Sequence, residues 1–244
     1  MIRLEAVTKT FERPVLRGVN LHVPEGSVYG LIGAGGAGKS VVVKMIAALV
    51  LPDGGEITVN GREILTMTET ELAGHRRNIG MVFQNNALFD FMTIGENVAF
   101  PLRRLGRVGD SEIRERVAER LSRVGLAGFE SRVPAGLSGG QKKRVGIARA
   151  TITRAPLVLC DEPAAGLDPV TSQRIFDLLR DEQRKSASTV LMVSSDIDRL
   201  LTVTDRIGVL HDGRIVFEGT TEETRASEVP LVRQLLNGDN DGPL

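Results

Sequence analysis

Residues 33–40 read GAGGAGKS, and this stretch decides the fold of the 244-residue chain. Gly33 and Gly38 bracket four small residues ahead of Lys39 and Ser40, which matches the pattern G-x-x-x-x-G-K-[ST]. Small residues let backbone N–H groups wrap around a phosphate, Lys39 can reach the β- and γ-phosphate oxygens, and the Ser40 hydroxyl can bind Mg²⁺. A β-rich run precedes the loop and an apolar helical pattern follows it. The stretch therefore predicts a nucleotide-phosphate cradle rather than a glycine-rich turn with a surface lysine.

The composition limits the possible classes of protein. Hydrophobic residues make up 41% of the chain, and 31 basic residues balance 31 acidic ones, so no overall field attracts nucleic acid or an anionic membrane. The one cysteine, Cys160, permits no internal disulfide, and the start MIRLEA lacks a signal-peptide pattern, which favours a reducing cytosolic setting. The apolar stretch 41–51 is far shorter than the roughly 20 residues that cross a bilayer. We expect no nucleic-acid partner and no membrane span.

The pattern changes along the chain from strands to helices and back. The first hundred residues alternate β-rich runs with turn signals, whereas Ile113, Val117, Leu121 and Val124 recur at helical spacing. Asp110 is the predicted N-cap of that helix and Gly125 its stop. We expect a helical insert over about 102–150 between two α/β pieces.

Strand patterns return after the insert. They occur at 157–161 and 189–193, and RIGVLHDGRIVFEG (206–219) predicts a hairpin with Asp212 and Gly213 in its turn. The last dozen residues are polar and contain glycine, which predicts an exposed tail.

An acidic pair follows the first of these strands. In LVLCDEP (157–163), an apolar run leads into Asp161 and Glu162. Beside a phosphate cradle, Asp161 would hold Mg²⁺ directly or through water, and Glu162 would act as general base on the attacking water. Alone, such a pair is more often a cap or a salt-bridge partner. The Lys39 loop favours the catalytic interpretation.

A second anion site is predicted at LSGGQ (137–141). Ser138 and Gln141 form an S-x-x-Q capping box at the start of a helix, whose remaining N–H groups and positive dipole end can meet an anion. The alternative is a simple capped helix with Lys142, Lys143 and Arg144 in solvent.

These motifs, together with AAGLDP (164–169), resemble those of the ATP-binding cassette (ABC) ATPases along nearly the whole chain. The resemblance implies an α/β fold, a P-loop NTPase ABC cassette with a RecA-like core, an antiparallel β subdomain and an α-helical subdomain. It implies one domain over 1–236, with the tail at 237–244. It also implies ATP and Mg²⁺ as cofactors, and a head-to-tail homodimer in which each cradle faces the partner's LSGGQ.

The resemblance also assigns roles to residues. Gln84 would contact Mg²⁺ and the attacking water, Asp168 would lie at the dimer interface, and Phe11 would stack on adenine unless it is a core residue. The catalytic set is Glu162, Gln84 and the Ser195 position, and the metal set is Ser40, Gln84 and Asp161. The nucleotide-binding set comprises Phe11, Gly33, Ala34, Gly35, Gly36, Ala37, Gly38, Lys39, Ser40, Val41, Ser138, Gly139, Gly140, Gln141 and Asp168.

One position departs from the family pattern. Where the family carries a histidine that contacts the γ-phosphate, this sequence has Ser195, and His22, His75 and His211 lie elsewhere. Serine is shorter and cannot carry an imidazolium charge. Losing one such donor could cost on the order of 3 kcal/mol, about a hundredfold in rate. A slow ATPase, rescue by water or a neighbour, and an engineered substitution all remain open.

A single cassette without a membrane span implies a separate permease. The segment 83–103 and the tail resemble the ATPases of Mla-type and Mce-associated phospholipid transporters, with the permease docking between Gln84 and Phe100 beside Leu88, Phe89, Phe91 and Met92. Any of these apolar residues could instead be core. This resemblance implies an MCE protein and in some systems a STAS-domain subunit as partners. It places the chain peripherally on the cytoplasmic side of a bacterial inner membrane.

Two other functions stay open. One is an ATPase for another permease, which would move amino acids or metal complexes. The other is a regulatory nucleotide-binding module of low turnover, suggested by Ser195. An ATPase sequence carries no information on the lipid transported or its direction.

Overall fold

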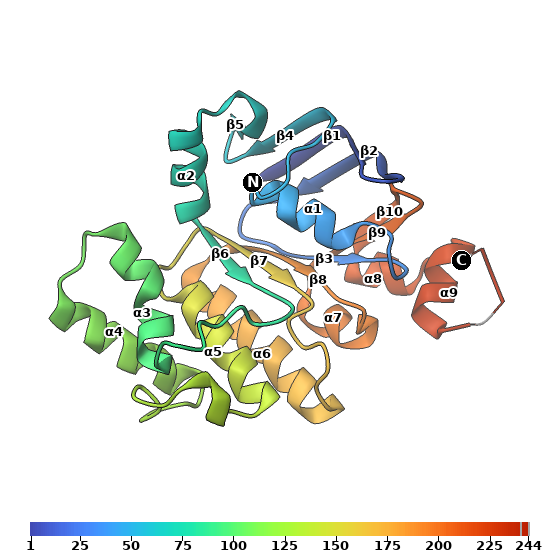
Figure 1. The fold of residues 1–244 in the computed structure, drawn as a ribbon. Coiled ribbons are helices and arrows are strands. Elements are labelled where there is room, and N and C mark those ends of the chain that lie inside the picture. Colours follow the sequence, from blue (N-terminus) through green and yellow to red (C-terminus); the bar gives the residue numbers. More distant parts are fainter. Residues whose placement is uncertain (240, 244) are drawn as a thin grey trace. The chain divides into compact units, whose positions relative to one another are not determined.

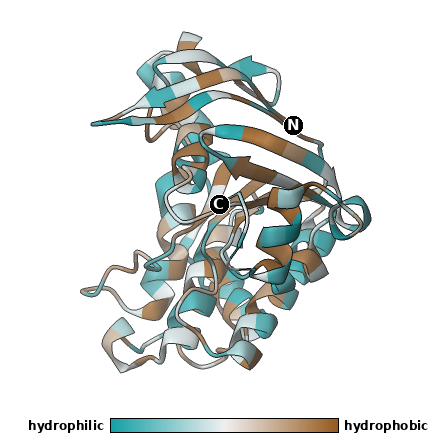
Figure 2. Ribbon diagram, turned by 90° about the vertical axis from the view of Figure 1, so that its right-hand side faces the viewer, coloured by the Kyte–Doolittle hydropathy of each residue, from teal (hydrophilic) through white to brown (hydrophobic). Residues whose placement is uncertain are grey.

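A computed structural model describes residues 1–239 and 241–243 (Figure 1). The chain divides into two compact units, one of Met1–Arg76 with Thr189–Leu244 and one of Arg77–Ser188. Within each unit, helices alternate between hydrophobic and hydrophilic residues, as expected of helices with one buried face (Figure 2).

The first unit contains an antiparallel sheet in the order β2-β1-β4-β5. Its strands are β1 (Ile2–Thr10), β2 (Pro14–Val23), β4 (Gly54–Val59) and β5 (Arg62–Glu63). Ile2, Leu4 and Val7 of β1 are almost fully buried, and the alternation of inward-facing residues is interrupted between Leu4 and Val7, where the pairing with β2 shifts register. A 3₁₀ turn, η1 (Ile64–Thr66), follows this sheet, and α2 (Glu69–Arg77) comes next in the chain.

The same unit contains the strands that position the phosphate cradle. Strands β3 (Val28–Ile32), β8 (Thr189–Val193), β9 (Arg206–His211) and β10 (Arg214–Thr220) lie in the order β10-β9-β3-β8, with β3 parallel to both β8 and β9. Both β3 and β8 are buried throughout, as expected for strands of a parallel sheet. Helix α1 (Lys39–Ile46) follows the loop after β3, and α7 (Ile197–Val203), α8 (Thr221–Arg225) and α9 (Pro230–Asn237) complete the unit.

The predicted hairpin is confirmed. Strand β10 pairs antiparallel with β9, and the turn residues Asp212 and Gly213 have φ of 45° and 74°. Positive φ at both central residues is the requirement of a two-residue type I′ turn.

The second unit is mainly helical. Strands β6 (Ile79–Val82) and β7 (Leu157–Asp161) pair in parallel, and the helices are α3 (Ile94–Leu105), α4 (Asp110–Arg123), the 3₁₀ turn η2 (Pro134–Gly136), α5 (Gly139–Thr151) and α6 (Pro169–Ser186). One apolar cluster, which includes Val98, Leu102, Leu121 and Val145, joins α3, α4 and α5. The helical stripe predicted at Ile113–Val124 belongs to this cluster.

Three details differ from the predictions. Asp110 is the first residue of α4 rather than its cap; Gly109 occupies the N-cap position and makes no side-chain cap bond. Helices begin earlier than residue 102, because Thr93 and Glu96 form a capping box that starts α3 at Ile94. The prediction of an exposed tail over the last dozen residues is wrong in its first part, since α9 continues to Asn237 and buries Gln234.

The rest of the predicted tail is only partly described. Asn240 and Leu244 lie outside the described residues, and residues 237–239 and 241–243 are exposed. In the described part of the chain, none of the helices combines the length and apolarity needed to cross a bilayer.

Candidate functional site

The loop 33–40 has a backbone that requires glycine at two positions. Gly33 has φ of 151°, and a Cβ there would lie 2.1 Å from the carbonyl oxygen of Leu210. Gly38, the N-cap of α1, has φ of 102°, and its Cβ would lie 2.8 Å from Leu16. Any side chain at these two positions would clash or be strained, so the loop conformation depends on them.

The predicted phosphate-binding lysine is held inside this loop. Lys39 is 9% exposed, and its Nζ donates to the carbonyl oxygens of Gly33 at 2.8 Å and Ala34 at 2.9 Å. Ser40 and Val41 follow in the first turn of α1. The ammonium therefore lies against the backbone of Gly33 and Ala34. Lys39 is also the first residue of α1, and a helix start favours a phosphate.

In the second unit, β7 ends at the predicted Mg²⁺ ligand. All five residues of β7 are buried, and Asp161 is 6% exposed. The next residue, Glu162, has φ of 49°, a left-handed conformation that is uncommon for a residue with a side chain. Such local strain persists where the surrounding structure enforces it, and it occurs often at functional sites.

Lys143 joins the Gln84 and Glu162 segments. This lysine is 4% exposed, and its Nζ donates to the carbonyl oxygens of Gln84 and of Glu162, the latter at 3.3 Å. Burial lowers the pKa of Lys143, while the charges of Glu162 and Asp161 oppose that shift. The alternative of a solvated Lys143 is therefore wrong, because the side chain spans the two segments that carry the predicted catalytic residues.

The second anion site has the predicted cap. Ser138 Oγ accepts from the backbone N–H of Gln141 at 3.3 Å, and Ser138 N–H donates to Gln141 Oε1 at 2.9 Å. Asp168 caps α6 by accepting from the N–H groups of Val170 and Thr171 at 3.0 Å each.

The two capped helix starts border one cavity of about 380 Å³, which Ser138, Gly139, Gly140, Asp168 and Arg174 help to line. The first turns of α5 and α6 therefore meet at a single polar recess, and Ser138, Gly139, Gly140 and Asp168 are brought together there. Three residues of the predicted anion site, Ser138, Gly139 and Gly140, therefore line one cavity within the second unit, and anion binding there stays a prediction.

A buried amide shapes the loop that follows Gln84. Asn97 is fully buried, its Oδ1 accepts from the N–H of Phe89 at 2.8 Å, and its Nδ2 donates to the carbonyls of Phe89, Met92 and Thr93 at 3.0, 3.2 and 3.0 Å. The two Nδ2 hydrogens are shared among these three carbonyls, and every partner of the amide is a backbone group. The loop between Phe89 and Thr93 is thereby fixed.

The same loop displays one aromatic side chain. Phe89 packs on Phe100 with ring centroids 4.9 Å apart, whereas Phe91 is 82% exposed. Phe91 is therefore accessible to a partner, although a single exposed apolar side chain does not by itself mark a contact surface. Phe91 is thus not core, while Leu88, Phe89 and Met92 are half-buried.

Two predicted residues lie on the surface of the first unit. Phe11 is 54% exposed and lies under Lys9 Nζ at 5.4 Å, so the alternative that it is a core residue is wrong. Ser195 is exposed and follows β8 directly after the buried Ser194. Stacking of Phe11 on adenine and the role of Ser195 remain predictions.

Sequence reasoning missed three buried polar residues. Asn97 and Lys143 are two, and the third is Arg149, which is 8% exposed and donates to the carbonyls of Asn86 at 2.6 Å and Ala87 at 2.5 Å. Both basic residues lie on α5, most of which is buried, but their carbonyl partners leave no complementary residue type in the sequence. Nothing in the local sequence marks Asn97, because its partners are backbone groups.

Comparison with known proteins identifies the class of this chain. The family described as ABC transporter matches residues 16–165, and the chain belongs to that family. It is therefore an ABC-type ATPase that uses ATP and Mg²⁺. Cassettes of this family dimerise and dock on a membrane permease, so the chain is a peripheral subunit on the cytoplasmic side of the inner membrane.

Similar proteins refine that class. The chain is 42% identical over 226 residues to the methionine import ATP-binding protein MetN of Caulobacter vibrioides. The aligned region covers 91% of this chain and 68% of that relative. It is 39% identical over 242 residues to MetN of Escherichia coli O157:H7, covering 97% of this chain and 70% of that one. These relatives support the amino-acid alternative and not the phospholipid assignment, nor the MCE and STAS partners.

Solved structures agree on the fold. The ATP-binding cassette MJ0796, in a dimeric post-hydrolysis state bound to ADP and Pi, matches with a TM-score of 0.84 and 34% identity over 91% of this chain and 99% of that one. CbiO1 from Clostridium perfringens, part of the transporter complex cbiONQ, matches with a TM-score of 0.85 and 28% identity over 93% and 91%. The predicted ABC cassette fold is confirmed.

Proposed function

We propose that this chain hydrolyses ATP to drive import of an amino acid, of the methionine class, through a separate permease. The observation that carries the proposal is 42% identity, over 91% of the chain, to a methionine import ATP-binding protein. The substrate does not contact the ATPase, so the relatives rather than the site geometry support this choice.

The proposed roles belong to residues of the Lys39 loop and of the segment that follows β7. Lys39 and the N–H groups of residues 33–38 bind the β- and γ-phosphates, and Ser40 and Asp161 hold Mg²⁺. Glu162 would accept the proton of a water molecule that Gln84 orients; the water attacks the γ-phosphorus, the bond to the β,γ-bridging oxygen breaks, and ADP and phosphate leave. Lys143 is a positioning residue, since it holds the backbone carbonyls of Gln84 and Glu162.

The anion site at Ser138 completes the proposal. The α5 N–H groups that the capping box leaves available would meet the γ-phosphate of ATP held by the partner subunit. Asp168, which caps α6 beside the same cavity, would lie at that interface. ATP then closes the dimer, and loss of the γ-phosphate lets it open.

Reconstitution tests the transport proposal. The chain is purified with its permease, placed in proteoliposomes, and assayed for ATP-dependent uptake of radiolabelled methionine, with Lys39→Ala as the inactive control. Uptake that requires ATP and is abolished by Lys39→Ala supports the proposal. A complex that hydrolyses ATP but takes up no amino acid refutes it.

Phospholipid transport remains a second candidate. The resemblance of residues 83–103 to Mla-type ATPases is the observation that favours it. In that case an MCE protein, and in some systems a STAS-domain subunit, would accompany the permease. ATP-dependent transfer of a fluorescent phospholipid between vesicles by the same complex, without methionine uptake, would favour this candidate.

A regulatory nucleotide-binding module of low turnover is the third candidate function. It is motivated by Ser195, which stands where the family has a histidine. Steady-state phosphate release by the complete complex distinguishes it from a transport ATPase. Release that is no faster with permease than without it would favour the regulatory module.

A further inference from the structure

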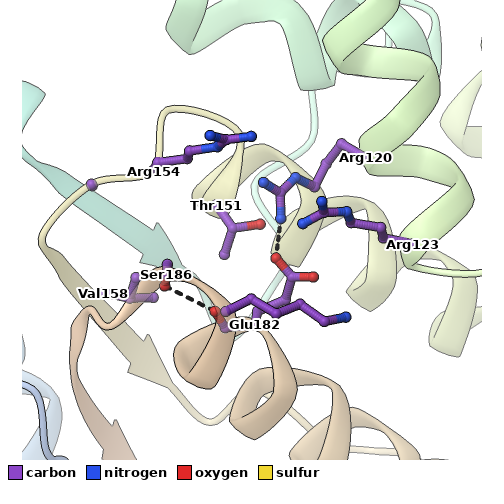
Figure 3. A pocket seen from close by; sticks show the side chains of 9 residues that line it. Arg120, Arg123, Thr151, Arg154, Val158, Glu182 and Ser186 are labelled. Atoms are coloured by element: carbon purple, nitrogen blue, oxygen red, sulfur yellow. Dashed lines mark hydrogen bonds and ion pairs between the residues drawn. The ribbon is translucent and has the colours of Figure 1, made fainter.

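A basic cavity lies in the second unit. It has a volume of about 330 Å³, and its lining comes from α4, the end of α5, the start of β7 and the end of α6 (Figure 3). Neither the Lys39 loop nor the Ser138 helix start contributes to it. Its volume suits a small metabolite.

The lining carries an excess of positive charge. Four cationic side chains, Arg120, Arg123, Arg154 and Lys185, face one carboxylate, Glu182, which leaves three positive charges in excess. Arg120 forms an ion pair with Glu182, and both side chains are buried. Within residues 1–239 and 241–243, the side chains of Arg154 and Lys185 have no ion-pair or hydrogen-bond partner. Arg123 pairs with the exposed Glu119 on its own helix at 2.5 Å.

Glu182 supplies a second, independent observation that points to a ligand. It is 5% exposed, Arg120 binds its Oε2, and its Oε1 is buried with no hydrogen-bond partner among the described residues. The side chains of Arg120, Arg123 and Glu182 point toward one another, with Arg154 beside them (Figure 3). A buried carboxylate oxygen without a donor is costly, so a ligand that brings an O–H group here would be favoured.

We propose that this cavity binds a small phosphomonoester that also carries a hydroxyl group, as a site separate from the nucleotide site. Arginine guanidinium groups match the geometry of phosphate oxygens, and Lys185 adds a mobile point charge. The hydroxyl group donates to Glu182 Oε1. This arrangement satisfies both the excess positive charge and the orphaned carboxylate oxygen with one molecule.

Calorimetry on the full chain tests the proposal with glycerol 3-phosphate as the probe. The chain is first saturated with Mg²⁺ and ADP, so that the nucleotide site is occupied. We expect saturable binding at millimolar probe, and at least a fivefold rise in Kd for Arg154→Gln and for Lys185→Gln. Both positions are exposed, so these variants should fold. The control is Arg184→Gln, an exposed change of the same charge on α6 outside the cavity, which should leave Kd within twofold.

Two results would overturn the proposal. One is the absence of saturable binding to the wild-type chain; the other is an equal loss of affinity in all three variants, which would indicate general electrostatics.

A second arm uses glycerophosphocholine, a zwitterionic diester with the headgroup of a phospholipid. It should bind more weakly than the monoester, and tighter binding of the diester would refute the monoester assignment.

Discussion

Replacing Asn97 by alanine tests how the loop after Gln84 is held. The four hydrogen bonds of this side chain all go to backbone groups between Phe89 and Thr93. Two of the three carbonyls keep another partner in the variant, because Phe89 O also accepts from Met92 N–H and Thr93 O from the backbone N–H of residue 97. Phe89 N–H and Met92 C=O are the two groups whose hydrogen bond to Asn97 is not replaced.

The magnitude follows from those two groups. A buried backbone group left without a partner costs about 1 to 3 kcal/mol. Two such groups give about 2 to 6 kcal/mol, and the loop can lower this cost by opening to water. We expect about 3 kcal/mol of destabilisation, which corresponds to roughly a hundredfold faster hydrogen exchange when about 1.4 kcal/mol is tenfold.

Native-state hydrogen exchange of the Phe89 amide measures this effect locally, and urea unfolding measures it globally. The matched control is Asn85→Ala, an exposed asparagine in the same loop, which should change stability by no more than about 0.5 kcal/mol. If Phe89 exchanges at the wild-type rate in Asn97→Ala, the amide does not hold the loop and the reasoning fails.

Two further predictions concern the proposed ATPase. Ser195→His should raise steady-state phosphate release by up to about a hundredfold at unchanged ATP affinity, since it restores one preorganised donor; unchanged release removes Ser195 from the mechanism. Ser138→Ala and Thr220→Ala each remove a capping box and should each cost about 1 kcal/mol by urea unfolding, but only the first should weaken ATP-driven dimerisation in gel filtration. Equal effects of the two on dimerisation would contradict the anion-site role.

Asp168 gives a prediction about pH. Hydrogen bonds from the Thr171 side chain and from backbone N–H groups hold the pKa of this carboxyl below its usual value. Its stabilising effect is therefore present above the unfolded pKa of about 3.9 and is lost as pH falls through the folded pKa. Calorimetric Tm values of wild type and Asp168→Ala should differ at pH 7 and converge in strong acid. A gap that is constant with pH would show that ionisation of Asp168 does not matter.

The phosphate cradle, the carboxylate strand and the capped helix were predictable because each depends on residues close together in the sequence. Gly33 and Gly38 set the loop through their own backbone angles, and Ser138 and Gln141 satisfy each other across one helical turn. Hydrophobic periodicity predicted α4, because it too depends on residues close together in the sequence. Helix α9 was missed, because the polar residues and glycines at the end of the chain suggested an exposed tail over the whole segment.

Long-range polar contacts could not be predicted. Lys143 meets the carbonyl of Gln84, 59 residues away, and Arg149 meets that of Asn86, 63 residues away. Side chains that bind backbone carbonyls leave no complementary residue type in the sequence. The transported substrate was hard to predict for a different reason: the 83–103 segment is the one expected to dock on the permease, so its likeness to Mla-type ATPases is weaker support for a substrate than the identity to MetN over the whole chain.

The interior position of Cys160 has a practical consequence. This thiol is fully buried, burial raises its pKa, and it is the single cysteine of the chain. Maleimide and methanethiosulfonate reagents need an accessible thiolate, so the native chain should be left unlabelled under gentle conditions. A cysteine introduced at an exposed position would then take up a fluorophore or a spin label at that one place, and opening and closing of paired cassettes could be followed without first removing a native thiol.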